Sequence, residues 1–340
     1  IMSALANLTK PNSVKIHLET LTPLYTGGIG QYGEQIHPAG LLGSLRHFSC
    51  LAATAVGNKT FATNVWGETG QAKQVALQWD ISQLKKIPLP SRIGWQDGAH
   101  KHRGWFFNEA KQGSLTLTVS RRGLSQSDWQ LLILALRIQI RCAMLGAKDQ
   151  FGLGIVKAEE LPTVSPLTEN QVRAPLTDTP NLDNAFFADI QFPCPAPDLR
   201  ECLEIGLRWR AHLRACFRSA DKTKDTKLRK LRHYLFGDLR DKFGSAINVS
   251  AVYPLNKAES ALRIWGVLPH TKRPDSKKNQ RGLPIYETVI KTRNPILTRL
   301  ENALNDGPKK HCQPTLNWQT GSNQNIAAWL NELAGMLFRE

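Results

Sequence analysis

The residues with the clearest chemical meaning lie in segment 21–48, LTPLYTGGIGQYGEQIHPAGLLGSLRHF. Glycines such as Gly27 and Gly28 let a backbone approach a phosphate closely. A helix that begins at Pro38 offers free N–H groups to an anion. Arg46, near the start of that helix, could add a salt link to the same phosphate. The segment therefore predicts an anion-binding site, and the alternative is a tight connection whose glycines serve only its turns.

A second glycine-bearing segment, KDQFGLGIV, occupies residues 148–156 after an apolar helical stretch. Its predicted contact residues are Lys148, Phe151, Gly152 and Gly154. A lone G-x-G between a helix and a strand usually marks a turn. The two segments lie about one domain length apart. Their order and spacing therefore support a functional interpretation more strongly than either motif does by itself.

Basic residues gather in two later clusters, and the chain has 44 Lys and Arg against 28 Asp and Glu, a net charge of +16. Such an excess is part of the electrostatic footprint of nucleic-acid binders. Neighbours at i, i+4 lie on one face of a helix, so the spacing of the first cluster predicts a basic stripe. The stripe comprises Arg210, Arg214, Arg218 and Lys222, and it continues with Lys224, Lys227, Arg229, Lys230 and Arg232. The second cluster spans 272–281, and Arg137 and Arg141 form a shorter pair. The alternative for each cluster is a solvated face.

Catalytic and metal-binding candidates are few. Glu34 is the only acid in residues 25–37, and His37 closes that stretch, so these two side chains are the candidates for acid–base chemistry. His100 and His102 have no evident further ligands, and the six cysteines follow no zinc-site spacing. The sequence predicts no metal and no cofactor.

Alternation and helical spacing predict the elements that position these residues. In the first half we expect a strand over 14–24, a helix from Pro38, a strand over 115–119 and a helix capped by Ser127 that runs to about Leu145. Residues 94–107 form an expected insertion. In the second half we expect strands over 186–192, 247–253 and 261–268, a helix over 199–217, and a closing helix over 327–338 with Trp318 before it.

A faint internal repeat supports two similar halves. The tripeptides Val65-Trp66-Gly67 and Leu235-Phe236-Gly237 each follow a predicted helix and precede a strand. The repeat predicts one strand–helix–glycine–strand unit used twice.

The first glycine-bearing segment resembles the opening of RAMP-superfamily proteins of type III CRISPR systems, and it is most similar to the two-unit Cmr-type subunits. The matching residues are Thr22, Pro23, Leu24, Gly27, Gly28, Pro38, Gly43, Leu45 and Arg46. The loop at Phe151–Gly154 resembles the glycine-rich loop of the same family. The resemblance implies an α+β fold of two ferredoxin-like (RRM-like) units with loop insertions, over 11–165 and 182–340, joined by a linker at 166–181.

The resemblance also implies an RNA-binding subunit of a type III CRISPR effector ribonucleoprotein in antiviral defence. Its partners would be crRNA, target RNA, and the RAMP backbone and large subunits. The RNA contacts would fall on the glycine, lysine, phenylalanine and arginine residues named above. One alternative is a RAMP-type endoribonuclease, and another is a protein-interaction subunit. RNA-cleaving family members carry an Asp between the first strand and the first helix, and residues 25–37 contain none, so we expect no cleavage. No apolar run approaches the roughly 20 residues that span a bilayer, and we predict a cytoplasmic protein.

Overall fold

The computed structural model describes most of the chain. The described residues are 13–26, 36–90, 92–97, 100–105, 109–146, 152–176, 182–218, 231–232, 235–237, 245–268, 293–307, 314–321 and 325–336. Among the helices in these ranges, none has both the length and the apolar character needed to cross a bilayer.

The first unit is an antiparallel sheet with helices on one side. Its strands lie in the order β2-β6-β1-β7, and β3 also pairs with β6. The main elements are β1 (Ser13–Thr20), α2 (Pro38–Ala55), β2 (Val75–Asp80), β6 (Glu109–Arg121), α4 (Gln126–Cys142) and β7 (Val156–Ala158). The additional elements are α3 (Phe61–Trp66), β3 (Leu84–Pro88), and a hairpin of β4 (Arg92–Asp97) and β5 (His100–Trp105). The β-α-β-β-α-β order with the first and third of these strands adjacent is ferredoxin-like.

The second unit repeats this topology. Its strands lie in the order β10-β11-β8-β12, and β9 also pairs with β11. The elements are β8 (Ala185–Phe192), α5 (Leu199–Ala215), β9 (Ile247–Val249), β10 (Tyr253–Pro254), β11 (Ser260–Val267), α8 (Arg293–Asn305), β12 (Thr315–Thr320) and α9 (Ile326–Leu333). The predicted α+β fold of two ferredoxin-like units is therefore confirmed. The unit boundaries at 165 and 182 stay a prediction.

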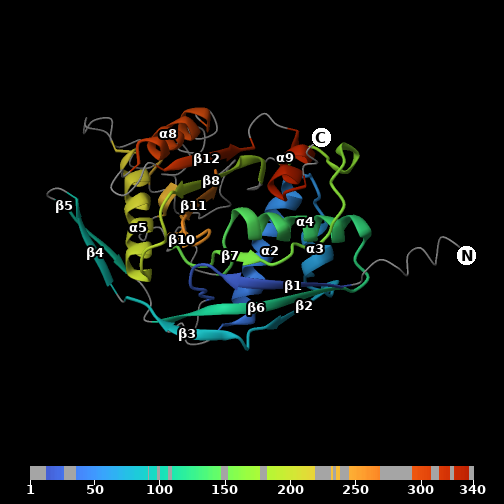
Figure 1. Cartoon of the computed structure of the whole chain (residues 1–340). Coiled ribbons are helices and arrows are strands. Elements are labelled where there is room, and N and C mark those ends of the chain that lie inside the picture. The colour runs from blue at the N-terminus through green and yellow to red at the C-terminus, as the bar shows by residue number, and fades with distance from the viewer. Residues whose placement is uncertain are drawn as a thin grey trace, which may run out of the picture.

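The two units stack so that the helices of the first cover one face of the second sheet (Figure 1). Alternate residues of β11 separate the two cores, because successive side chains of a strand point to opposite faces. Ala261 and Trp265 pack with α2 and α4, whereas Leu262 and Ile264 pack with α5 and α8. The Trp265 ring lies 5.7 Å from that of Phe48 on α2, in an edge-on arrangement. The layers follow the order sheet, helices, sheet, helices.

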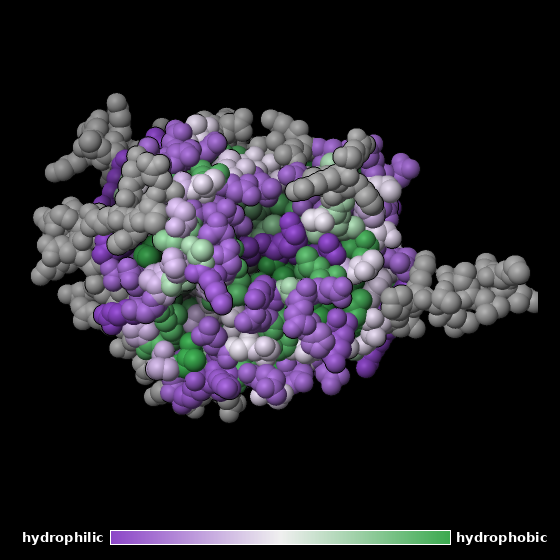
Figure 2. All heavy atoms as spheres, in the orientation of Figure 1, coloured by the Kyte–Doolittle hydropathy of each residue, from purple (hydrophilic) through white to green (hydrophobic). Residues whose placement is uncertain are grey.

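The outer face of the first sheet stays open and polar. Along β1, exposed Lys15, His17 and Glu19 alternate with buried residues such as Ile16 and Leu18. Figure 2 shows that the face of the molecule in view is mostly hydrophilic, with hydrophobic residues gathered towards its middle. The open sheet face has none of the aromatic residues along β1 that stack on bases in RRM-type sheets.

A buried arginine of the second unit fastens the two units to each other at a helix end. Arg263 on β11 donates through Nε to Asp189 (3.0 Å) and through Nη1 to the carbonyls of Ile140 (3.4 Å) and Ala143 (3.3 Å), at the end of α4. Cations are favourable at helix C-termini, where carbonyl groups lack partners within the helix. The second unit therefore caps a helix of the first.

The predicted basic pair on α4 makes the reciprocal contact. Arg137 donates to the carbonyl of Ala334 at 3.1 Å, and Arg141 donates to that of Leu333 at 3.0 Å, both at the end of α9. Arg137 also donates to the carbonyl of Pro162 at 2.7 Å. The pair thus makes contacts within the chain, where Arg137 is half-buried and Arg141 is exposed. Contact of this pair with RNA stays a prediction.

Several predicted elements need correction. The cap of α4 is Ser125, whose side chain accepts from Asp128 N, so Ser127 lies inside the helix, and the helix ends at Cys142. The predicted strand 247–253 is split into β9 and β10, and Trp318 lies in strand β12. Most of the β4–β5 hairpin lies in the insertion expected over 94–107.

The repeated tripeptides have the same local structure in both halves. Trp66 and Phe236 each end a helical turn and are buried, and the glycines that follow them have positive φ angles, 74° at Gly67 and 82° at Gly237. Glycine adopts this backbone conformation without steric penalty. The repeat therefore reflects a helix stop used in both units.

Candidate nucleic-acid interface

The two glycine-bearing segments meet at one end of the first sheet. Gly154 N donates to the carbonyl of Pro23 at 2.9 Å, and Leu145 N donates to the carbonyl of Gly154 at 2.8 Å. Gly146 N donates to Ser44 Oγ on α2 at 3.2 Å. These contacts join the segment that follows β1, the first half of α2 and the residues on both sides of the glycine-rich loop. We call the described residues 23–26, 36–46, 145–146 and 152–155 the glycine-loop junction.

Glycine is required here because backbones come very close together. A Cβ on Gly40 would collide with the carbonyl of Thr26, and a Cβ on Gly154, whose φ is 96°, would collide with that of Leu145. The Thr26 hydroxyl also accepts from His37 N at 2.7 Å. Close backbone packing therefore accounts for Gly40 and Gly154, and the turn-forming alternative from the sequence fits Gly154. RNA contacts by Gly152 and Gly154, which are buried, stay a prediction.

Arg46 is the exposed cation of this junction. It lies about 12 Å along the α2 axis from Pro38, at 1.5 Å per residue, on the face opposite the buried Leu41 and Leu45. Among the described residues, no hydrogen bond or ion pair engages the Arg46 guanidinium. The first turn of α2 carries no acidic residue, and its N-cap, His37, gives no side-chain cap. Within the described residues of α2, the positive charge at this helix start is therefore not offset by an acid in the first turn.

Two lysines on neighbouring strands lie near this junction, and the sequence prediction missed them. Lys111 on β6 pairs with Leu24, four residues beyond the end of β1, through backbone bonds of 2.7 and 3.0 Å. Lys86 on β3 lies opposite Lys111 and forms an ion pair with Glu109 at 2.6 Å. The adjacent lysines 85 and 86 were the available signal, but only the strand pairing places them beside the glycine-bearing segments.

The predicted basic stripe does not follow a single helix. Arg210 and Arg214 lie on α5 and are half-buried, but α5 ends at Ala215, so Arg218 lies beyond the helix and is exposed. Arg210 donates to the carbonyl of Phe236 at 3.3 Å. Both helical arginines have partners within the chain. The continuous-stripe prediction is therefore wrong for the described part, since the helix stops before its third member.

The remaining predicted site residues lie outside the described ranges. They are Gly27, Gly28, Glu34, Lys148, Phe151, Lys222, Lys227, Arg229 and Lys230, together with the cluster at 272–281.

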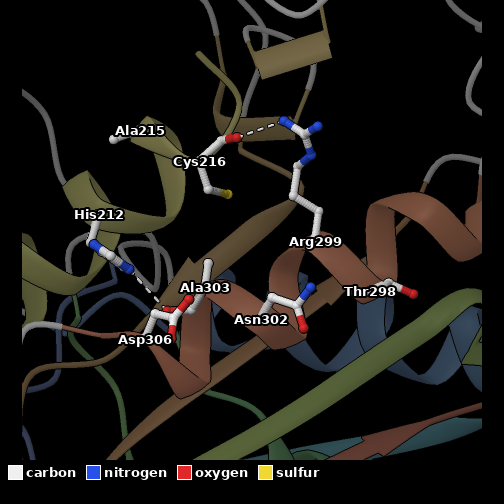
Figure 3. Close-up of a pocket in the computed structure, with 8 residues that line it drawn as sticks. All are labelled: His212, Ala215, Cys216, Thr298, Arg299, Asn302, Ala303 and Asp306. Carbon is white, nitrogen blue, oxygen red and sulfur yellow. Dashed lines mark hydrogen bonds between the residues drawn. The ribbon is translucent and has the colours of Figure 1, made fainter. Parts of the chain in front are cut away.

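An open groove of about 780 Å³ runs between α5 and α8 (Figure 3). His212 Nε2 lies 2.9 Å from the carbonyl of Ala303, and Arg299 donates to that of Cys216 at 2.8 Å. Burial raises the pKa of the Cys216 thiol to about 12, so the thiol stays protonated at neutral pH. The polar groups of the groove mainly tie the two helices together.

Catalytic candidates are not assembled in the part of the chain that the structure describes. His37 is the N-cap residue of α2, and its proposed companion Glu34 is outside the described ranges. No group of three or more His, Cys, Asp or Glu among the described residues is arranged to hold a metal ion.

The fold and this junction define an α+β chain of two ferredoxin-like units, with buried glycines at the junction and the exposed Arg46 beside them. No family model matches the sequence, and no curated protein matches it. Among solved structures, the chain is similar to Cmr1 from Pyrococcus furiosus in its apo form, with 14% identity, a TM-score of 0.43, and coverage of 83% of this chain and 96% of that one.

The chain is also similar to chains in two cryo-EM structures of the Type III-B Cmr-beta. In the complex bound to cognate target RNA, the identity is 10% and the TM-score 0.44, over 85% of this chain and 99% of that one. In the complex bound to cognate target RNA and AMPPnP, state 2, in the presence of ssDNA, the values are 12% and 0.46, over 87% and 100%. No functional conclusion follows from similarities of this size.

Proposed function

We propose that this chain is an RNA-binding subunit of a type III CRISPR effector ribonucleoprotein in the cytoplasm. It would hold crRNA, or the duplex of crRNA with target RNA, through contacts to the RNA backbone, beside RAMP backbone and large subunits. The observation that carries the proposal is the junction itself. Described parts of two glycine-bearing segments far apart in sequence are hydrogen-bonded to each other, and Gly146 contacts the helix that carries the exposed Arg46.

The chemistry of the junction suits an RNA backbone. Phosphates are recognised by cations, backbone N–H groups and helix N-termini, which carry no sequence information. Arg46, Lys111 and the start of α2 supply these groups without a neutralising acid in the first helical turn. A guide strand must vary in sequence, so contacts of this type fit a guide-holding role. The polar, non-aromatic outer face along β1 offers no comparable stacking platform.

The test compares single cation-to-glutamine variants that change the net charge equally. Arg46→Gln and Lys111→Gln remove charge at the junction, whereas the control Arg208→Gln removes it from α5, where Arg208 donates to Glu204 at 2.9 Å. Binding to single-stranded RNA and to a guide–target duplex is measured over a salt series. Each lost phosphate contact should reduce the single-strand salt slope by about 0.7 and weaken affinity several-fold.

The outcomes separate the candidate functions. Equal losses in all three variants would mean that overall charge, rather than the junction, drives binding. Wild-type affinity that is negligible and independent of salt would remove the RNA-binding function and leave a protein-interaction subunit. Cleavage of precursor crRNA by the isolated chain, abolished in His37→Ala, would instead establish the endoribonuclease alternative.

A further inference from the structure

The glycine-loop junction also reaches into the core of the second unit. Leu153 is only 1% exposed, and it packs in the same cluster as Ile264 on β11 and Leu207 on α5. Beside it, Ala251 N donates to the carbonyl of Gly152 at 3.0 Å. The turn formed by Gly152, Leu153 and Gly154 belongs to the first unit in sequence, but the second unit holds it.

The segment that holds the turn is itself confined between two glycines. A Cβ on Gly152 would collide with Ala251 N, and a Cβ on Gly206 of α5 would collide with the carbonyl of Ser250. The Ser250–Ala251 segment therefore lies in backbone contact with α5 on one side and with the glycine turn on the other.

Hydrogen bonds also fix the segment to the second sheet. Ser250 N donates to the carbonyl of Arg263 at 2.7 Å, and Ser250 Oγ accepts from Arg263 N at 2.7 Å. Strand β11 holds the Ser250–Ala251 segment from the side. A methyl group added at Gly206 must therefore push this segment towards Gly152. Closely packed interiors transmit such displacements rather than absorbing them.

We propose that α5 and the Ser250–Ala251 segment set the position of the glycine turn, and that Gly206 and Ala251 are positioning residues for the RNA contacts of the junction. The RNA part rests on the proposed function, whereas the positioning of the turn does not. Packing between the units and contact with RNA are then coupled, although neither residue touches RNA.

The experiment uses the full chain with Gly206→Ala and the matched control Gly321→Ala. Gly321 is another tightly packed glycine of the second unit, where an added Cβ would collide with the carbonyl of Asp183 instead. Both variants are compared below their unfolding temperatures, by amide hydrogen exchange at Leu145, Gly154 and Ala251 and by affinity for single-stranded RNA.

We expect Gly206→Ala to speed exchange at these three amides by about tenfold. RNA affinity should fall about tenfold, because positioned sites tolerate displacements of only about 0.5 Å. Gly321→Ala should change neither quantity. Unchanged exchange in Gly206→Ala would overturn the proposal, and so would an equal loss of affinity in both variants. If the wild-type chain binds no RNA, the proposed function fails, while the exchange comparison still decides the positioning.

Discussion

Arg263→Met should be one of the most destabilising single substitutions in the chain. The Arg263 side chain is 10% exposed, and it connects Asp189 of its own sheet to two carbonyls at the end of α4. Methionine fills a similar volume but offers no donor, so both carbonyls lose this partner, and the carboxylate keeps the hydrogen bond that the Tyr253 hydroxyl donates at 3.3 Å.

The magnitude follows from these contacts. Removing one partner of a buried ion pair costs about 3–5 kcal/mol. Asp189 keeps 32% of its side chain exposed, so water replaces part of the lost interaction. We therefore expect a loss of unfolding free energy at the lower end of this range, about 3 kcal/mol. The bonds to Ile140 and Ala143 are long, at 3.4 and 3.3 Å, and we assign each only about 0.5 kcal/mol.

The assay is urea unfolding followed by both circular dichroism and tryptophan fluorescence, because a two-unit chain must first be shown to unfold in one step. The double variant Arg263→Met/Asp189→Leu is the companion measurement. Because the double variant removes both charges, its loss of unfolding free energy should be about 2 kcal/mol smaller than the sum of the losses in the two single variants. A loss below about 1 kcal/mol in Arg263→Met, or strict additivity in the double variant, would refute the assignment of Arg263 as the clamp between the units.

Two further predictions concern the helix cap and the thiols. Ser125→Ala should destabilise the chain by about 1 kcal/mol through loss of the α4 cap, and Ser127→Ala should cost less than half of that; thermal unfolding of both variants checks this. Burial raises the pKa of Cys142 to about 11 and those of Cys202 and Cys216 to about 12. Alkylation of these thiols is followed by mass spectrometry, and at pH 8 it should be at least about 100-fold slower in the native chain than in the unfolded chain. The native rate should rise about tenfold per pH unit, because the reactive thiolate fraction does. Labelling at the unfolded rate would contradict the burial of these thiols.

The periodic spacing of apolar residues along the sequence predicted several helices and strands. The alternation in β1 and the apolar faces of α2 and α5 were visible in the sequence and are present in the structure. Helix α8 was missed, although Ile296, Leu297, Leu300, Ala303 and Leu304 have helical spacing and are buried.

Partners of charged residues could not be predicted from local sequence. Arg263 bonds a carbonyl 123 residues away, and Arg141 bonds one 192 residues away. A basic residue that caps a distant helix has the same local sequence signal as one that faces solvent. The glycine-bearing segments were found because glycine marks close backbone approach, but their meeting, and the place of Lys111 beside them, depends on strand order.

The covering of the second sheet by α2 and α4 has a consequence for synthesis on the ribosome. The helices of the first unit are synthesised early, yet Phe48 can pack against Trp265 only after more than 200 further residues have been added. At about 5–20 residues per second this delay lasts roughly 10–40 s. Throughout that time the apolar outer side of the helical layer lacks its native cover. Nascent chains arrested before β11 should therefore bind chaperones and aggregate more readily than chains arrested after α9.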